Sequence, residues 1–271
     1  MSASINNNDL VLCYATLPDV SFRTRVECAS HAGFQAISLF PEGFHKAREN
    51  EGLSAADMKK ILADNNIYIA ELDPMLSWIP DIHPTNDEEI FYRIAESIGA
   101  RSINVVHAGV EQLPEHQIVA ALGGLCERAA KYDLLVHIEF LPWTQINSIT
   151  SAYRIVEQVN QINLGIMFDS WHHFRSQTDN SDLLKIPGSS IFAIQLNDAP
   201  QNSAYDIFTE TLQHRLLPGE GDINLREIIS YFKQIGVTAP VGIEVFSLAL
   251  SRIAPQLLAK NAYQSIKNLL R

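Results

Sequence analysis

Strand-like and helix-like segments alternate along this chain at a nearly constant spacing, which restricts the fold more than any other feature. Short runs of β-branched and other apolar residues are each followed by a segment with helical periodicity. The expected strands begin 24, 33, 35, 32, 30, 27 and 50 residues apart. This repeat is typical of a parallel sheet, because neighbouring parallel strands need a crossover connection. We predict eight strands, at Leu10–Thr16, Phe34–Phe40, Ile67–Asp73, Ser102–His107, Leu134–Phe140, Leu164–Asp169, Ile191–Asn197 and Val241–Phe246.

Seven helices are expected between and after these strands, and capping residues mark several of their ends. Ser54 and Ser148 can accept hydrogen bonds from the unpaired N–H groups at a helix start. Gly33, Gly99 and Gly236 follow helical segments, where glycine commonly ends a helix. The expected helices are Ser21–Ser30, Ser54–Asn65, Asp87–Ile98, Pro114–Lys131, Ser148–Asn160, Leu225–Gln234 and Pro255–Leu270, with at most a helical turn at 181–185.

Eight strand–helix units predict an α/β protein with a closed (β/α)₈ TIM barrel. An open doubly wound sheet is the alternative, but no expected strand is followed by a GxGxxG or phosphate-loop sequence. The 271 residues fit one barrel and no linker divides them, so residues 1–271 are expected to form a single domain. The longest interval between strands contains residues 198–224, which we expect to form a long, functional loop.

Charge, cysteine content and the first residues narrow the partners and the location. With 20 basic and 31 acidic residues, the net charge of −11 repels phosphate backbones and anionic lipid, so neither nucleic acid nor membrane is an expected partner. Cys13, Cys28 and Cys126 form no CxxC motif, which argues against a disulfide framework or a cysteine zinc site. Residues 1–9 lack signal-peptide features and favour a cytoplasmic location. A homo-oligomer is compatible with these observations.

Oxygen-bearing side chains stand near the carboxyl ends of the last four expected strands, where barrel enzymes place their active sites. Each lies among apolar residues, where an unpaired carboxylate is costly, and few basic residues stand nearby in these segments. One divalent cation (Mn²⁺, Mg²⁺, Co²⁺ or Zn²⁺) is the simplest compensation, and buried acids paired with Lys or Arg are the alternative. The expected ligands are Glu139 in VHIEF, Asp169 in IMFDSWHHF, Gln195 in FAIQLNDAP and Glu244 in VGIEVF.

Other side chains near the strand ends are candidates for substrate contact. His107 ends the fourth expected strand and therefore faces the mouth, and Trp143 lies on the loop after Glu139, where its ring could cover a sugar face. His137 has the same inward parity as Glu139 but lies two residues deeper, which favours core packing. The candidates are His107, Trp143, His172 and, on the long loop, Arg215; ordinary packing or a solvated position is the alternative for each.

The four oxygen-bearing residues and two later motifs resemble the xylose-isomerase-like TIM barrel superfamily. The resemblance covers nearly the whole chain and also includes Asp169-x-x-His172 and the sequence HRLLPGEG at residues 214–221. It implies that the four residues form a metal shell, that His172 contacts a substrate oxygen, and that Arg215 reaches a hydroxyl or carboxylate. The superfamily includes sugar isomerases and epimerases, inosose-processing enzymes, 3-dehydroshikimate dehydratases and endonuclease IV, so the motifs specify the superfamily better than the reaction.

Proton abstraction beside a carbonyl is the chemistry that this residue set can perform. A divalent cation that chelates a carbonyl and a neighbouring hydroxyl would acidify the adjacent C–H and stabilise an enediolate. Glu139 and Glu244, separated by two strands around the rim, are the expected base and acid. We therefore predict a metal-dependent isomerase or epimerase of a small keto-sugar or related polyhydroxy carbonyl compound.

A lyase that dehydrates 3-dehydroshikimate is the alternative function. Gln195 and the sequence QLNDAP resemble dehydratases of the superfamily, whereas many of its sugar epimerases have histidine at this position. The carboxylate of that substrate would need a cationic anchor, for which Arg215 and the loop residues Lys46 and Arg48 are candidates. The acidic charge and single ligand set disfavour a DNA endonuclease. The complete ligand set disfavours a binding barrel without turnover.

Overall fold

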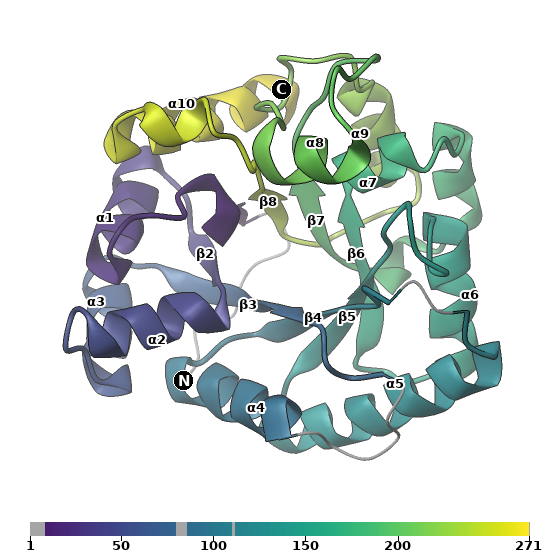
Figure 1. Cartoon of the computed structure of the whole chain (residues 1–271), viewed down its shortest axis with the longest axis horizontal. Coiled ribbons are helices and arrows are strands. Elements are labelled where there is room, and N and C mark those ends of the chain that lie inside the picture. The colour runs from purple at the N-terminus through teal and green to yellow at the C-terminus, as the bar shows by residue number, and fades with distance from the viewer. Residues whose placement is uncertain (1–8, 80–85, 110–111, 271) are drawn as a thin grey trace.

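A computed structural model describes residues 9–79, 86–109 and 112–270. Within these ranges, eight parallel strands form a closed barrel in chain order, and β1 pairs with β8 to complete it. Helices surround the barrel (Figure 1). The predicted α/β class and (β/α)₈ barrel are therefore confirmed. Residues 1–8, on which the predicted location largely depends, lie outside the described residues.

The strands are short and mostly buried, and each overlaps a predicted strand. Residues Tyr14–Thr16 form a 3₁₀ helix, so the predicted end of the first strand is wrong. The backbone of Tyr14 forms hydrogen bonds with side chains instead of a neighbouring strand. Its N–H donates to Ser38 Oγ, and its carbonyl accepts from Arg25 Nη1. The strands are β1 Leu10–Leu12, β2 Ala36–Leu39, β3 Tyr68–Met75, β4 Ser102–Val106, β5 Leu135–Glu139, β6 Leu164–Asp169, β7 Ile191–Leu196 and β8 Val241–Ile243.

The seven predicted helices are present, and their predicted caps are confirmed at several ends. Ser54 and Ser148 each form a capping box with the residue three positions later. Gly33, Gly99 and Gly236 have positive φ angles after helices, a conformation that glycine adopts without steric cost. The helices are α1 Phe22–Ala32, α3 Ala55–Asp64, α4 Asn86–Ile98, α5 Glu115–Ala129, α6 Ile149–Val159, α9 Leu225–Gln234 and α10 Pro255–Leu270.

Three further helices lie where loops were expected: α2 Pro41–Glu49, α7 Ser170–Arg175 and α8 Ile207–Gln213. Helix α2 begins directly after β2 with proline at its first position, where a missing N–H costs nothing. Lys46 and Arg48 are therefore on a helix, and their predicted loop position is wrong. Residues 198–224 contain α8, whose first turn is capped by Asp206, so this interval is only partly a loop.

Thr16 joins the first and last strands at the carboxyl end of the barrel. Its hydroxyl donates to the Ile243 carbonyl at 2.8 Å and accepts from the Val245 N–H at 3.1 Å. These bonds connect residues that are 227 and 229 positions apart in the sequence. They hold the backbone on either side of Glu244, and thus help to place a predicted site residue.

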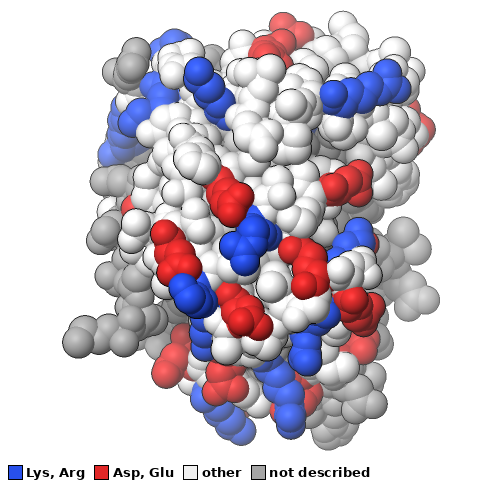
Figure 2. Space-filling model, turned by 90° about the vertical axis from the view of Figure 1, so that its left-hand side faces the viewer, with Lys and Arg blue, Asp and Glu red and all other residues white. Residues whose placement is uncertain are grey.

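The side of the molecule on which α1, α2 and α3 lie carries charges of both signs. Figure 2 shows basic and acidic side chains interspersed over this face. Exposed pairs one helical turn apart, such as Lys46–Glu42 and Lys60–Asp64, account for part of the pattern. Such pairs contribute little stability, because water screens them. In the described part of the chain, no helix is both long and apolar enough to cross a membrane.

Candidate functional site

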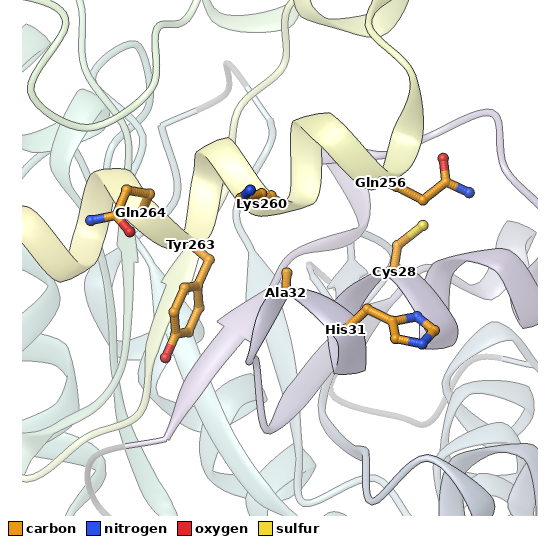
Figure 3. Close-up of a pocket in the computed structure, with 7 residues that line it drawn as sticks. All are labelled: Cys28, His31, Ala32, Gln256, Lys260, Tyr263 and Gln264. Carbon is orange, nitrogen blue, oxygen red and sulfur yellow. The ribbon is translucent and has the colours of Figure 1, made fainter.

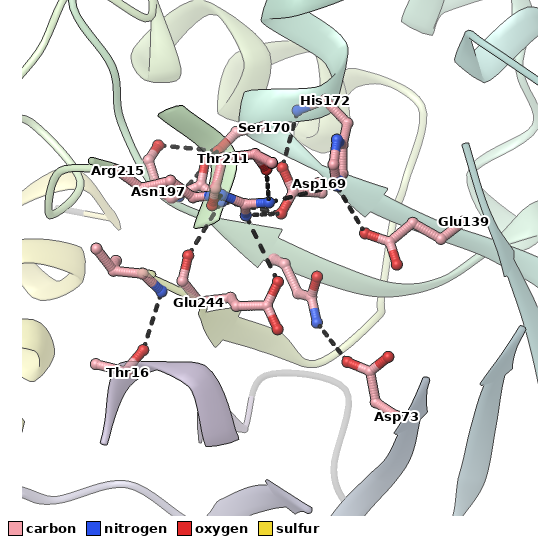
Figure 4. Close-up of polar contacts among 12 residues, drawn as sticks. Thr16, Asp73, Glu139, Asp169, Ser170, His172, Asn197, Thr211, Arg215 and Glu244 are labelled. Carbon is pink, nitrogen blue, oxygen red and sulfur yellow. Dashed lines mark hydrogen bonds and ion pairs between the residues drawn. The ribbon is translucent and has the colours of Figure 1, made fainter. Parts of the chain in front are cut away.

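The four predicted metal ligands lie together at the carboxyl end of the barrel, and Figure 4 labels three of them, Glu139, Asp169 and Glu244. Glu139 ends β5, Asp169 ends β6, Gln195 lies beside Asp169 in β7, and Glu244 directly follows β8. All four are buried, with at most 6% of the residue surface exposed. A buried imidazole joins them, since one ligand atom each from Glu139, Asp169 and His172 lie within 4.8 Å of one another.

Asp169 positions His172 through the short helix α7. Asp169 is the N-cap of this helix, and its Oδ1 accepts the His172 backbone N–H at 2.9 Å. The Asp-x-x-His spacing therefore places the imidazole over the site, with Nε2 at 3.4 Å from Glu139 Oε1. Burial lowers the pKa of His172 to about 3, so the ring is neutral near pH 7.

Arg215 reaches the site from the segment after α8 and is 2% exposed. Its Nη1 lies 2.9 Å from Asp169 Oδ2 and 3.5 Å from Glu244 Oε2. Thr211 holds the same guanidinium through its carbonyl and hydroxyl oxygens, and the Trp171 ring packs against it at 5.2 Å. The expectation that few basic groups lie near these acids is therefore incomplete, because folding brings Arg215 to them from outside the strands.

Asp73 is a further carboxylate of the site that the sequence analysis missed. It lies in β3, is 3% exposed, and accepts hydrogen bonds from Asn104 Nδ2 at 2.9 Å and Gln195 Nε2 at 3.3 Å. The same Asn104 nitrogen donates to Glu139 Oε2 at 2.7 Å. A signal for Asp73 was present, because it ends a predicted strand just as Asp169 does, but only the last four strands were compared.

The charges of the site are unbalanced. Burial and the nearby Asp73 carboxylate raise the pKa values of Glu139 and Glu244 well above the usual range. Burial also raises the pKa of Asp73 to about 6. For Asp169, burial acts in the same direction, but the Arg215 guanidinium, the His172 ring and the hydrogen bonds from the His172 N–H and Asn197 together outweigh it, and the pKa is lowered. Among the described residues, four carboxylates thus lie at the mouth, and Arg215 forms ion pairs with two of them, Asp169 and Glu244.

The donor atoms of the site fit a divalent cation. Gln195 Oε1 is buried and has no hydrogen-bond partner among the described residues, whereas its Nε2 is bonded to Asp73. A buried carbonyl oxygen without a partner costs free energy unless a ligand or ion binds it. His172 Nδ1 is likewise unpartnered within the described ranges. Carboxylate and amide oxygens and neutral imidazole are the ligands that divalent cations take, so these residues could hold one.

The remaining predicted substrate contacts also lie near the mouth. His107 directly follows β4, is 2% exposed, and has no hydrogen-bond partner for either ring nitrogen among the described residues. Trp143 is half-buried, with its ring centroid 5.7 Å from that of His172 and 5.0 Å from that of Phe208 in α8. His137 lies deeper, within 2.8 Å of Ser102 Oγ, in the predicted core position. Substrate contact by His107 and Trp143 stays a prediction.

A hollow lies outside the barrel, between α1 and α10 (Figure 3). It differs from the mouth because its lining contains no carboxylate. The lining residues are Cys28, His31, Ala32, Gln256, Lys260, Tyr263 and Gln264. The cluster of acids at the barrel mouth is therefore the candidate active site.

Comparison with known proteins agrees with the barrel. A sequence model of the family described as xylose isomerase-like TIM barrel matches residues 26–269. The chain belongs to this family. Among solved structures, the "IOLI protein with a binding zinc atom" superposes on this chain with a TM-score of 0.86, at 20% identity, over 97% of this chain and 98% of that one.

Two groups of curated relatives of this xylose isomerase-like barrel have different activities. The 3-dehydroshikimate dehydratases of Pseudomonas putida and Pseudomonas aeruginosa are 30% and 27% identical to it over 94% of this chain. The chain spans only 39% of the length of these two relatives. An inosose isomerase of Halalkalibacterium halodurans is 33% identical over 47% of this chain and 45% of its own length.

Proposed function

We propose that this chain is a divalent-metal-dependent enzyme that removes a proton from the carbon beside a carbonyl in a small polyhydroxylated substrate. This proposal rests on the cluster of buried carboxylates at the mouth, where Arg215 pairs with Asp169 and Glu244. It also rests on Gln195 Oε1, which has no hydrogen-bond partner among the described residues. A bound divalent cation would stabilise the negative charge that develops on the substrate oxygen. The zinc atom in the IOLI structure supports this proposal.

Glu139 and Glu244 are the proposed proton-transfer groups. They extend from the ends of β5 and β8, and both have pKa values raised by burial. An ionised carboxylate whose pKa is raised is a stronger base than an ordinary glutamate. His172, near Glu139, and Arg215, near Glu244, are the proposed donors of hydrogen bonds to substrate oxygens. Trp143 forms an apolar wall on the His172 side.

Dehydration of 3-dehydroshikimate is the outcome that we favour for this step. One glutamate takes the proton from carbon, and the other gives a proton to the departing β-hydroxyl, so that water is released. The alignment of both dehydratases over 94% of the chain supports this reaction, as does the amide at Gln195. Arg215 is the cation in the described part of the site that a substrate carboxylate could approach.

Isomerisation or epimerisation, the function favoured by the sequence alone, is the second candidate. It uses the same proton abstraction and returns the proton to the neighbouring carbon or to the other face. The inosose isomerase relatives support it, although they align over about half of the chain. The two functions differ in whether a carbon–oxygen bond breaks.

The test follows both outcomes with one preparation of enzyme. The chain loaded with Mn²⁺ or Co²⁺ is incubated with 3-dehydroshikimate, and ultraviolet absorbance reports the aromatic product. Parallel incubations with inosose and keto-sugars in D₂O are followed by NMR for exchange of carbon-bound hydrogen. Aromatic product supports the dehydratase, and exchange without loss of water supports the isomerase. If neither signal appears at high enzyme concentration, the proposed proton abstraction on these substrate classes is contradicted.

A further inference from the structure

A network of hydrogen bonds crosses the barrel mouth from β7 through β3 and β4 to β5. Gln195 Nε2 donates to Asp73 Oδ2 at 3.3 Å, and Asp73 Oδ1 accepts from Asn104 Nδ2 at 2.9 Å. Asn104 Nδ2 also donates to Glu139 Oε2 at 2.7 Å. Figure 4 shows Asp73 with a hydrogen bond from a neighbouring amide, away from the Arg215 and Asp169 group. This network therefore links two of the four predicted ligands, Gln195 and Glu139.

The donors and acceptors in this network determine which end of the Gln195 amide is left without a hydrogen bond. An ionised carboxylate only accepts hydrogen bonds, so Asp73 selects the NH₂ end of the amide. The oxygen end is then left over, and Gln195 Oε1 is indeed the buried atom without a partner among the described residues. If the amide turned over, its NH₂ group would face the site and would repel a cation. The acid thus decides whether Gln195 can act as a ligand.

We propose that Asp73 is a positioning residue that holds Gln195 with Oε1 toward the bound cation, with Asn104 holding Glu139 in the same network. This inference rests on the metal dependence in the proposed function, and not on which reaction follows. Asp73 and Asn104 are 3% and 0% exposed, so water does not compete strongly for their hydrogen bonds. Hydrogen-bond partners of metal ligands commonly alter metal affinity by about 10- to 100-fold when they are removed.

The first experiment measures Mn²⁺ affinity by calorimetric titration of the metal-free full chain. Asp73→Ala should weaken the affinity by about 10- to 100-fold. Asp73→Asn should have a smaller effect, because its single carbonyl oxygen can accept from Gln195 or from Asn104 but not fully from both. The matched control is Glu71→Gln, which changes a buried acid two residues earlier in β3 that has no hydrogen bond to Gln195. Its affinity should stay within about twofold of wild type.

A second experiment separates positioning from a simple loss of negative charge. In a Gln195→Glu background, position 195 carries an acceptor and needs a donor, so Asp73→Asn should no longer weaken Mn²⁺ binding. The amide at position 73 would donate to position 195 and accept from Asn104, so both hydrogen bonds of position 73 would be kept. If Asp73 only adds charge, Asp73→Asn weakens binding equally in both backgrounds, and positioning is overturned. Circular dichroism and thermal unfolding in chelator verify that each variant folds.

The outcomes distinguish this inference from the proposed function. If wild type binds Mn²⁺ and Asp73→Ala binds it within twofold, the positioning role is wrong while the proposed metal enzyme stands. If the metal data follow expectation but no substrate reacts, the reaction is wrong and the positioning role stands. If wild type binds none of Mn²⁺, Co²⁺ and Zn²⁺, both proposals are overturned.

Discussion

Two clusters of buried charge in this molecule follow opposite rules. On the outer ring, Glu88 of α4 accepts hydrogen bonds from Arg128 Nε and Nη2 at 2.5 and 3.0 Å, and from the Tyr92 hydroxyl at 2.6 Å. The Glu88 carboxylate is therefore paired with the Arg128 guanidinium. At the barrel mouth, Arg215 pairs with only two of the four carboxylates in the described part of the chain, and Gln195 Oε1 has no partner there.

The difference between the clusters separates a contribution to stability from a contribution to function. A buried acid with a complete set of donors stabilises the packing of its helices, and removing one partner leaves a buried charge unpaired. A buried cluster with surplus negative charge opposes folding until something positive binds. Natural proteins retain such destabilising clusters where function requires them. The Glu88 cluster should therefore respond to mutation in stability, and the mouth cluster in binding and turnover.

The largest expected effect is on proton transfer at the mouth. Glu139→Gln should slow incorporation of solvent deuterium into substrate by about 10²- to 10⁴-fold, because the base is lost. The metal-free variant should be no less stable than wild type, since one charge leaves a crowded cluster. NMR in D₂O and urea denaturation measure the two effects. Exchange at the wild-type rate would show that Glu139 is not the base, and Glu88→Gln serves as a control that keeps exchange.

Metal addition should stabilise the protein through the mouth alone. Mn²⁺ at about 100 times its Kd should raise the free energy of unfolding by about 2.7 kcal/mol, and a chelator should reverse the change. Asp169→Asn should show a smaller increment because it removes a ligand oxygen. Glu88→Ala should show the full increment despite its lower starting stability. Thermal unfolding with and without Mn²⁺ measures this, and an equal increment in Asp169→Asn would place the cation elsewhere.

Breaking the outer cluster should have the reverse signature. Glu88→Ala leaves Arg128 without its acid and should lower the free energy of unfolding by about 1–3 kcal/mol, since the remaining donors are partly buried. Metal affinity and turnover should be unchanged. Urea denaturation and Mn²⁺ titration of the same preparation test both statements. A loss of metal affinity with unchanged stability would mean that the two clusters are not separate.

Glu71, beneath the mouth, should make stability depend on pH. Burial, and then the neighbouring Asp73, raise its pKa to about 8. The folded state therefore keeps a proton that the unfolded chain releases near pH 4.5, and stability falls as pH rises through this window, by at most about 1.4 kcal/mol per pH unit. Glu71→Gln should flatten the profile between pH 5 and 8. Denaturation across this range measures it, and identical slopes would contradict the raised pKa.

The smallest effect is expected on the outer surface, at Lys46. Its ammonium pairs with Glu42 one helical turn away, and about half of its side chain is exposed. Lys46→Ala should change the free energy of unfolding by less than about 0.5 kcal/mol, and turnover should stay near wild type. Steady-state kinetics with 3-dehydroshikimate measure the second quantity. A large rise in KM would restore Lys46 as the anchor for a substrate carboxylate.

The barrel was predictable because strand–helix alternation is local, whereas its interruptions depend on distant partners. The backbone of Tyr14 leaves the sheet through bonds to Ser38 and Arg25, which no local pattern reveals. Helix α8 is short and was hidden in an interval without a strand. The single domain over residues 1–271 and the cytoplasmic location stay predictions.

The candidate site was partly predictable for a similar reason. Position at a strand end placed Glu139, Asp169, Gln195 and Glu244 near one another, because parallel strands share their carboxyl edge. The pairing of Arg215 with these acids requires the path of α8 across the barrel, which the sequence does not show. The contact of Asp73 with Gln195 joins residues 122 positions apart, and only the closed barrel brings them together.

The bonds of Thr16 to the Ile243 carbonyl and the Val245 N–H make the position of Glu244 depend on closure of the barrel. Contacts between residues so far apart in sequence form only after a large loss of chain entropy. Glu244 stands between these two residues, so it acquires its place only when the two ends of the barrel meet. Metal affinity during refolding should therefore rise with the final closure of the barrel, and not with the earlier gain of helix.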